Sequence, residues 1–189
     1  LSVVLFLFVG CFCAIFMGRL GDFVDYYLYV DKKSGLPNRE RCDAAIDHYS
    51  TTRLKGQFTI IYIQLDLSAM SRNDGDKALR LLGDQLQYVF RTLGFVGYNG
   101  AVHFIVLLEN CSFDLAKNCV NRLGSLLAKT EFARFGPCIF VGIANSAKDN
   151  AYEIRALLRL SIRRCADAKA HQEAENAKNA AASPLVSKS

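Results

Sequence analysis

The chain has 189 residues, of which 51% are hydrophobic and 22% are charged. This composition excludes a disordered chain, and the length fits one ordinary domain with short appendages rather than a large multidomain enzyme. Lysine and arginine exceed aspartate and glutamate by five charges, 23 against 18, which is too small an excess to indicate nucleic-acid binding.

The N-terminal residues form an apolar run, LSVVLFLFVGCFCAIFM, that contains no charge. We expect residues 1–18 to be the C-terminal part of a transmembrane helix, with a signal-peptide core or a buried helix as alternatives. Residues 19–30 carry an apolar stripe at helical spacing, which predicts an amphipathic linker helix. Basic residues follow the run, so the positive-inside tendency predicts a cell-membrane protein whose remaining residues face the cytoplasm; they are Arg19, Lys32, Lys33, Arg39 and Arg41.

The middle of the chain alternates between helical and strand-like patterns. Helical periodicity and capping residues predict helices at 38–53, 76–93, 113–129 and 151–169. Short apolar runs predict strands at 57–65, 95–98, 101–108 and 137–144. The Asn99-Gly100 dipeptide predicts a type I′ hairpin turn between the second and third strands. The order predicts an α/β (α+β) fold, in which a mixed sheet with a β-hairpin is flanked by helices after the N-terminal transmembrane helix.

The C-terminal residues and the cysteines complete the survey. Residues 172–189 are rich in Ala, Asn, Lys and Ser and predict a flexible tail. The seven cysteines are scattered without a Cys-x-x-Cys pair. We interpret them as reduced thiols that pack as small hydrophobic side chains, with a metal or disulfide site as the alternative.

The segment Asp31-Lys32-Lys33-Ser34-Gly35-Leu36-Pro37-Asn38-Arg39 resembles the D-x-L-T-G-L-x-N-R motif that opens the GGDEF domains of diguanylate cyclases. It keeps the Asp, Gly, Leu, Asn and Arg of that motif, whereas Lys33 replaces the usual Leu. Gly75-Asp76 at a helix start, the hairpin, and Ala168-Lys169 in the last helix follow in the family's order. The resemblance implies a degenerate, nucleotidyl-cyclase-like GGDEF domain over residues 31–171.

In this family two facing domains each hold one GTP, and Mg²⁺ ions assist the attack of a ribose 3′-hydroxyl on an α-phosphate. Mg²⁺ takes oxygen ligands, and the resemblance implies carboxylates at the end of the first strand and at two hairpin positions. The first-strand position is Gln64 here, and the pentapeptide in register is Gly100-Ala101-Val102-His103-Phe104. Asp66 remains on the same strand face, but the family's second Asp is not the principal ligand. We therefore expect Mg²⁺ binding to be lost, with no metal, no cofactor and no catalytic residue.

The resemblance leaves a vestigial nucleotide site and a vestigial inhibitory site. Asp76 matches a residue that accepts hydrogen bonds from guanine, and Lys169 matches a phosphate-binding lysine. The alternative for this pair is an Asp that favours the helix dipole and a solvated Lys. Glu173 stands where the family often has Arg and would repel phosphate. Of the inhibitory R-x-x-D motif, which binds cyclic dimeric GMP, only Arg91 remains.

Three further positions have alternative interpretations. We interpret His103 as a structural or surface residue of a strand, with a metal ligand or a general base as the alternative. The carbonyl oxygen of Gln64 is a weak candidate for residual Mg²⁺ binding, because it carries no charge. A basic face on the last helix is either solvated or docks to anionic lipid or a partner; it consists of Arg159, Arg163 and Arg164.

A retained scaffold beside absent metal ligands favours a membrane-anchored signalling domain that does not synthesise cyclic di-GMP. It would act by forming a homodimer or by binding another signalling protein. The second hypothesis is a diguanylate cyclase with atypical ligands, or one that contributes half a site to an intact partner. The third is a binding module that keeps a guanine nucleotide as a weak allosteric ligand at Asp76 and Lys169.

Overall fold

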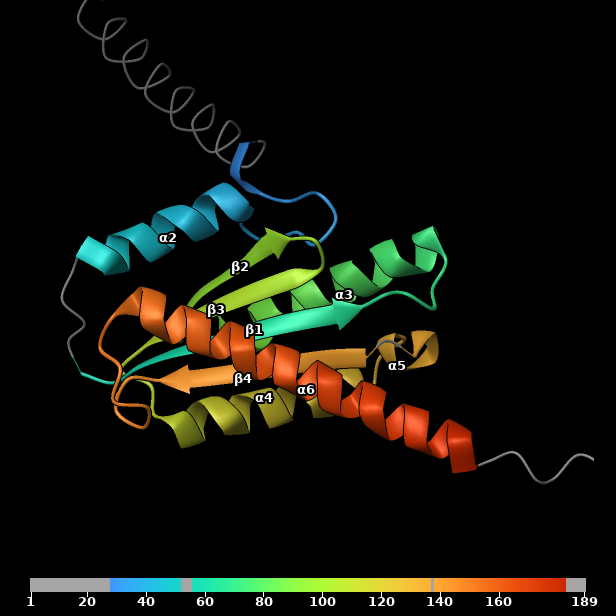
Figure 1. Ribbon diagram of the computed structural model, residues 1–189. Coiled ribbons are helices and arrows are strands. Elements are labelled where there is room, and N and C mark those ends of the chain that lie inside the picture. The colour runs from blue at the N-terminus through green and yellow to red at the C-terminus, as the bar shows by residue number, and fades with distance from the viewer. Residues whose placement is uncertain (1–27, 52–55, 137, 183–189) are drawn as a thin grey trace, which may run out of the picture.

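The computed structural model describes residues 28–51, 56–136 and 138–182, which form one sheet with helices on both of its faces (Figure 1). The helices are α2 (Arg39–Thr51), α3 (Arg72–Phe90), α4 (Phe113–Leu127), α5 (Phe132–Phe135) and α6 (Ile154–Ala182). The strands are β1 (Phe58–Asp66), β2 (Gly94–Gly100), β3 (His103–Glu109) and β4 (Cys138–Asn145). Each helix and strand expected between residues 38 and 169 is present, and α5 is an additional short helix.

The strands lie in the order β2-β3-β1-β4, and each neighbouring pair is antiparallel. The predicted mixed sheet is therefore wrong. The crossovers β1-α3-β2 and β3-α4-β4 each join two strands of the same direction, but β3 lies between β1 and β2, and β1 lies between β3 and β4. Because the two crossover units interleave, none of the described parallel strands are neighbours.

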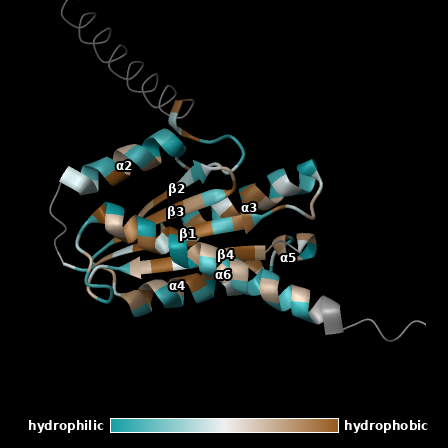
Figure 2. Cartoon of the chain, viewed as in Figure 1, coloured by the Kyte–Doolittle hydropathy of each residue, from teal (hydrophilic) through white to brown (hydrophobic). Residues whose placement is uncertain are grey.

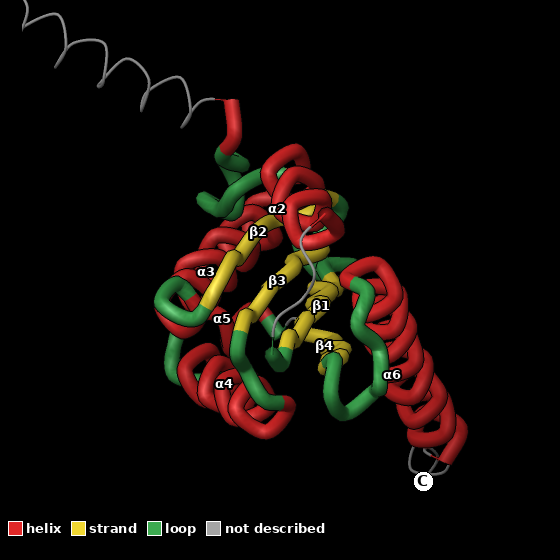
Figure 3. Tube along the Cα trace, turned by 90° about the vertical axis from the view of Figure 1, so that its left-hand side faces the viewer, coloured by secondary structure: helices red, strands yellow, loops and turns green. Residues whose placement is uncertain are grey.

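Both faces of the sheet are buried beneath helices (Figure 3). α3 and α4 cover one face, where Ile63, Phe104 and Val106 belong to the core. α2 and α6 cover the other face, where Ile60 and Tyr62 belong to a second core. Hydrophobic residues concentrate on the strands between these layers (Figure 2). Successive residues of one strand thus enter different cores, which explains why the strands are almost continuously apolar.

α3 begins one turn earlier than the expected start at Gly75-Asp76. Its N-cap is Ser71, whose Oγ accepts a hydrogen bond from Asp74 N (3.2 Å) and donates one to Asp74 Oδ2 (2.7 Å). Asp76 consequently lies beyond the first helical turn, where the favourable effect of the helix dipole on a carboxylate has largely fallen off. The predicted N-cap of α4 is confirmed, because Ser112 Oγ accepts a hydrogen bond from the backbone at 3.2 Å.

The hairpin turn lies two residues later than predicted. Its central residues are Ala101 and Val102, whose φ angles are +45° and +65°, whereas Gly100 already pairs with His103. Positive φ at both central residues is what a type I′ turn requires, so the predicted placement at Asn99-Gly100 is wrong although the sign of both angles agrees. Leu65 N of β1 donates to Val102 O at 3.0 Å, and this bond extends the pairing of β3 toward the turn.

The backbones of α6 and β4 are in direct contact at Gly142. A Cβ atom on Gly142 would lie 1.9 Å from Ser161 O, so the glycine allows this approach. Arg164 donates to Ile143 O (2.6 Å) and makes two hydrogen bonds with the Asp149 carboxylate (2.8 and 2.7 Å). These bonds hold the pKa of Asp149 below its usual range, because they favour the ionised form. Arg164 therefore does not belong to an exposed basic face.

α6 continues to Ala182, so residues 172–182, for which the composition predicts a flexible tail, are helical. Residues 171–178 are exposed and helical. Ala, Glu, Gln and Lys are strong helix formers, and their helix propensity explains why the helix persists beyond its contacts with the sheet. Residues 183–189 lie outside the described part of the chain.

The predicted transmembrane segment, residues 1–18, lies outside the described residues. The predicted linker helix, residues 19–30, is described only from Leu28, and Val30 at its end forms a β-bridge with Pro37. Among the described helices, none combines the length and the apolar character needed to cross a bilayer.

The described cysteines are free thiols, and they are not all buried. Cys42, Cys111 and Cys165 are buried, whereas Cys138 is exposed. Burial is the main reason that the pKa of Cys42 is raised to about 12, because a thiolate is poorly solvated inside the protein. The buried thiols therefore pack as small hydrophobic groups.

Candidate functional site

Residues 31–38 form a tight turn before α2. Asp31 Oδ1 accepts hydrogen bonds from Lys33 N (3.1 Å), Ser34 N (2.7 Å) and Ser34 Oγ (2.9 Å). Two backbone bonds of 2.8 Å close the turn, from Asp31 N to Leu36 O and from Gly35 N to Asp31 O. Gly35 has a φ of +72°, which favours glycine, and Leu36 is only 1% exposed. The retained motif residues therefore determine the shape of this turn.

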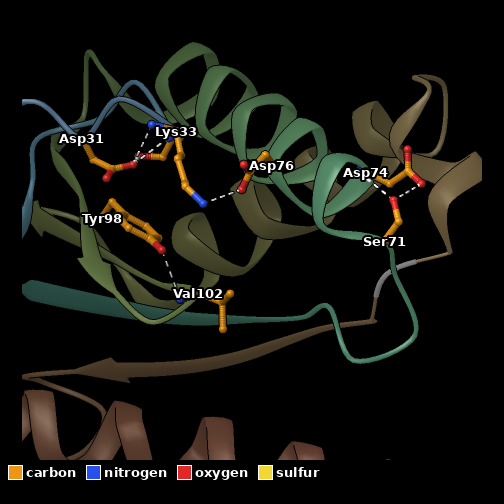
Figure 4. A network of polar contacts seen from close by, with 8 residues as sticks. Asp31, Lys33, Ser71, Asp74, Asp76, Tyr98 and Val102 are labelled. Atoms are coloured by element: carbon orange, nitrogen blue, oxygen red, sulfur yellow. Dashed lines mark hydrogen bonds and ion pairs between the residues drawn. The ribbon is translucent and has the colours of Figure 1, made fainter.

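The turn is packed between α3 and the hairpin. A Cβ atom on Gly83 would lie 2.2 Å from Ser34 O, so α3 and the turn are in backbone contact. On the hairpin side, Tyr98 N donates to Pro37 O at 2.7 Å. Tyr98 Oη in turn accepts a hydrogen bond from Val102 N at 3.3 Å (Figure 4). One short segment thus contacts both the helix that carries Asp76 and the hairpin that carries residues 100–104.

Lys33 extends from this turn toward α3. Its Nζ lies 2.7 Å from Asp76 Oδ1, and the two side chains are 48% and 41% exposed (Figure 4). Asp74 points away from Lys33 and forms part of the helix cap with Ser71. The candidate guanine-binding carboxylate therefore has a partner within the chain. The sequence interpretation missed this contact, although the basic residue at a position where the family usually has Leu was a signal.

His103 lies on the sheet face that α6 covers. It pairs with Gln64 of β1, and its ring stacks on Tyr62 with centroids 5.3 Å apart. Burial is the main cause that lowers the pKa of His103, and the charge of Lys169 acts in the same direction, although a hydrogen bond with Gly100 opposes them. The structure thus presents His103 as a packed ring whose protonated form is disfavoured.

Asp66 and Lys169 lie at the same end of the sheet, where β1 ends and β3 begins. Asp66 Oδ1 accepts a hydrogen bond from Ser68 N at 2.9 Å. Hydrogen bonding with Ser68 is the main reason that the pKa of Asp66 is lowered, and the charge of Lys169 adds to this effect. Lys169 Nζ lies 3.9 Å from Glu173 Oε1, so Glu173 offsets part of the positive charge that a phosphate would need.

The donor atoms at this end of the sheet do not fit a Mg²⁺ ion. Mg²⁺ requires near-octahedral oxygen ligands, commonly from carboxylates. At the three positions where the resemblance implies carboxylates, the chain presents the amide of Gln64, the methyl groups of Val102 and the imidazole of His103. Within residues 28–51, 56–136 and 138–182, no group of three or more His, Cys, Asp or Glu residues is arranged to hold a metal ion.

The structure does not join the candidate nucleotide residues to one another. Asp76 contacts Lys33 on the α3 side of the sheet. Lys169 belongs to α6 on the other side of the sheet, where its charge lowers the pKa values of His103 and Asp66. None of the contacts in the described part of the chain links Asp76 to Lys169.

The residues in register with the family's hairpin and inhibitory motifs are likewise divided. Phe104 is buried in the core beneath α3 and α4, and Val102 packs partly against it, whereas His103 faces α6. Arg91, which matches the Arg of the family's inhibitory motif, is the exposed C-cap of α3, where its backbone N–H donates to Gln87 O. It therefore precedes β2 and lies at the opposite end of that strand from the hairpin tip.

Solved structures with the same arrangement are GGDEF domains. The coiled coil and GGDEF domain of DgcB from Caulobacter crescentus, in complex with c-di-GMP, matches with a TM-score of 0.71 and 11% identity, and the match covers 90% of this chain and 96% of that chain. The chain has the GGDEF-domain fold. Diguanylate cyclase SiaD from Pseudomonas aeruginosa, in complex with its activator SiaC, gives a TM-score of 0.57 and 16% identity over 82% of this chain and 66% of that chain.

A sequence relative agrees with this fold. Diguanylate cyclase DgcP from Pseudomonas aeruginosa is 27% identical over 109 residues, which are 54% of this chain. The match spans 16% of the length of DgcP. No family model matches the sequence. The resemblance to GGDEF domains that the sequence suggested is thus confirmed as a likeness of fold.

Proposed function

We propose that this chain is a membrane-anchored signalling domain of the cyclic-di-GMP class that does not synthesise the dinucleotide. It acts instead by forming a homodimer or by binding another signalling protein or a guanine nucleotide. The observation that carries this proposal is the hairpin tip, where an ordered GGDEF scaffold presents Val102 and His103 in place of the two acidic side chains.

The chemistry of cyclisation explains why these replacements matter. Phosphoryl transfer depends on positive groups that neutralise charge on the transferring phosphate, and a metal ion supplies much of that charge when carboxylates hold it. Gln64 contributes no negative charge, and Val102 contributes no ligand atom. His103 is packed against Tyr62, with its protonated form disfavoured, so it is poorly suited to act as a cationic substitute. The remaining Asp66 is a single carboxylate that Ser68 already engages.

Partner binding and membrane attachment belong to the same proposal. The solved GGDEF structures of similar fold include one in complex with c-di-GMP and one in complex with an activator protein, which supports a ligand-binding or partner-binding role. The uncharged run in residues 1–18 supports a transmembrane anchor, and the basic residues that follow it support a cytoplasmic position for the domain.

Incubation of the whole chain with GTP and either Mg²⁺ or Mn²⁺ tests the loss of synthesis. We expect no cyclic di-GMP above a protein-free blank by liquid chromatography, whereas DgcB in the same buffer is the positive control. A variant with Gln64→Asp, Val102→Glu and His103→Glu restores carboxylates at all three positions and asks whether their absence is the cause. Turnover by the unmodified chain would contradict the proposal.

A second candidate function is one half of an active site shared with an intact cyclase. The hairpin favours it, because the scaffold is present and a partner could supply the missing metal ligands. Mixing the chain with an active GGDEF cyclase should then raise product formation per active subunit. If the mixture is no more active than the cyclase alone, the shared-site function is rejected and the non-catalytic role is supported.

A further inference from the structure

The ion pair between Lys33 and Asp76 is a departure from the opening motif that this chain resembles. The motif has an apolar residue at this position, which cannot pair with a carboxylate. In this chain the ammonium group lies 2.7 Å from Asp76 Oδ1 and comes from a residue 43 positions earlier (Figure 4). The contact therefore depends on how the turn is placed against α3.

The packing of the turn holds Lys33 in reach of Asp76. The carboxylate of Asp31 accepts the backbone N–H groups of both Lys33 and Ser34. Ser34 is completely buried, and its carbonyl approaches α3 so closely that Gly83 has no room for a Cβ atom. Because the backbone on both sides is fixed, forming the ion pair restricts little beyond the Lys33 side chain itself.

Asp76 is the kind of group that binds paired N–H donors. An ionised carboxylate accepts hydrogen bonds at both oxygens, and two adjacent donors on a planar ligand satisfy it in a bidentate manner. The N1–H and N2–H edge of guanine presents such a pair of donors. With Lys33 on Oδ1, one of the two oxygens is already engaged.

We propose that Lys33 is a specificity-determining residue that competes with a guanine base for the carboxylate of Asp76. The inference rests on the nucleotide-binding part of the proposed function. A base must displace the Lys33 ammonium group before it can use both oxygens of Asp76. Since exposed ion pairs are weak, removing Lys33 should raise the affinity for guanine by about 1.5-fold to 5-fold.

If Lys33 instead helped to bind the nucleotide, removing it would lower the affinity rather than raise it. If its ammonium group recruited phosphate, removing it would weaken the binding of a charged nucleotide. Guanosine carries the base without phosphate and therefore isolates the competition at Asp76. GDP carries both the base and phosphate groups, so its affinity reports the competition at Asp76 together with any attraction between Lys33 and phosphate.

The test is a titration of the whole chain, kept in detergent micelles, with guanosine, adenosine and GDP, followed by NMR. We expect Lys33→Met to bind guanosine about 1.5-fold to 5-fold more tightly than the unmodified chain, with no change for adenosine. Lys77→Met is the matched control, because Lys77 is exposed on the same helix and no hydrogen bond or ion pair of the described residues joins its ammonium group to Asp76. The gain should vanish when Asp76→Asn is also present, and it should shrink at high salt, which screens the ion pair.

Each other outcome overturns the inference. Equal or weaker guanosine binding by Lys33→Met, or no binding by that variant, would show that Lys33 does not compete at Asp76. A gain that persists with Asp76→Asn, or that Lys77→Met reproduces, would show a general effect of charge. None of these results bears on synthesis, whereas formation of cyclic di-GMP from GTP would overturn the proposed function.

Discussion

The turn at residues 31–38 and the hairpin tip at residues 100–104 are in contact through Tyr98, yet they differ in what they keep of the GGDEF pattern. In the turn, the matching residues Asp31 and Leu36 have clear roles in folding, one as a hydrogen-bond acceptor and one in the core. In the tip, Phe104 is fully buried and matches the pattern, whereas the positions that would bind metal do not. Residues that stabilise the scaffold thus match the pattern, whereas Val102 and His103 stand where the pattern has acidic side chains.

Among the substitutions that test this difference between the turn and the tip, the largest change in the free energy of unfolding is expected at Asp31. Asp31→Ala removes the acceptor for three hydrogen bonds, so it should lower the free energy of unfolding by about 1–3 kcal/mol in urea denaturation. Asp43→Ala is the control, because Asp43 is exposed and makes a single 3.9 Å ion pair that contributes at most about 0.5 kcal/mol. Equal costs for the two variants would mean that the turn does not need its carboxylate.

A smaller effect of opposite sign is expected at the hairpin tip. Ala101 has a φ of +45°, so Ala101→Gly relieves about 1–2 kcal/mol of backbone strain and costs about 0.5–1 kcal/mol in chain entropy. The expected net result is a stabilisation of up to about 1.5 kcal/mol by urea denaturation, with no gain of cyclase activity. Ala44→Gly on the exposed face of α2 should instead destabilise the chain by about 1 kcal/mol. A loss of stability in Ala101→Gly would indicate that the tip is not strained.

The smallest effect concerns the pH dependence of stability at His103. Its pKa is lowered from the ordinary 6.5 in the folded chain, so the unfolded chain binds more protons near that pH. The stability associated with the neutral ring is present above pH 6.5 and is lost as the pH falls through the folded pKa. His103→Gln should therefore lose less stability than the unmodified chain between pH 7.5 and pH 5.5 in urea titrations. Parallel losses in the two proteins would contradict this assignment.

The local patterns predicted most of the helices and strands because each pattern depends on neighbours in the chain. Ser112 was correctly predicted as the N-cap of α4, because the cap and its bonded N–H lie three residues apart. The start of α3 differs from the prediction at Gly75-Asp76, because Ser71 caps the helix one turn earlier. The helical end of α6 was missed because its Ala-rich composition also fits a disordered chain.

The hairpin shows a local preference overridden by pairing with a distant strand. Asn99-Gly100 favours a turn by itself. However, β3 pairs with β1 as far as His103, and the bond from Leu65 N to Val102 O extends this alignment to Val102. The turn moves to Ala101 and Val102, neither of which favours positive φ. Register with the central strand therefore outweighed the intrinsic preference of the dipeptide.

The sequence by itself determined which side chains are available. It predicted an opening motif and a hairpin, and it showed that the positions where the GGDEF pattern has metal-binding carboxylates carry none, because these are statements about residue types and short spacings. Only the tertiary structure decided that the sheet interleaves its strands, that His103 stacks on Tyr62, and that Lys33 reaches Asp76 across 43 residues. Those contacts depend on packing between segments distant in the chain, where backbone approach at glycines such as Gly83 fixes which charges meet.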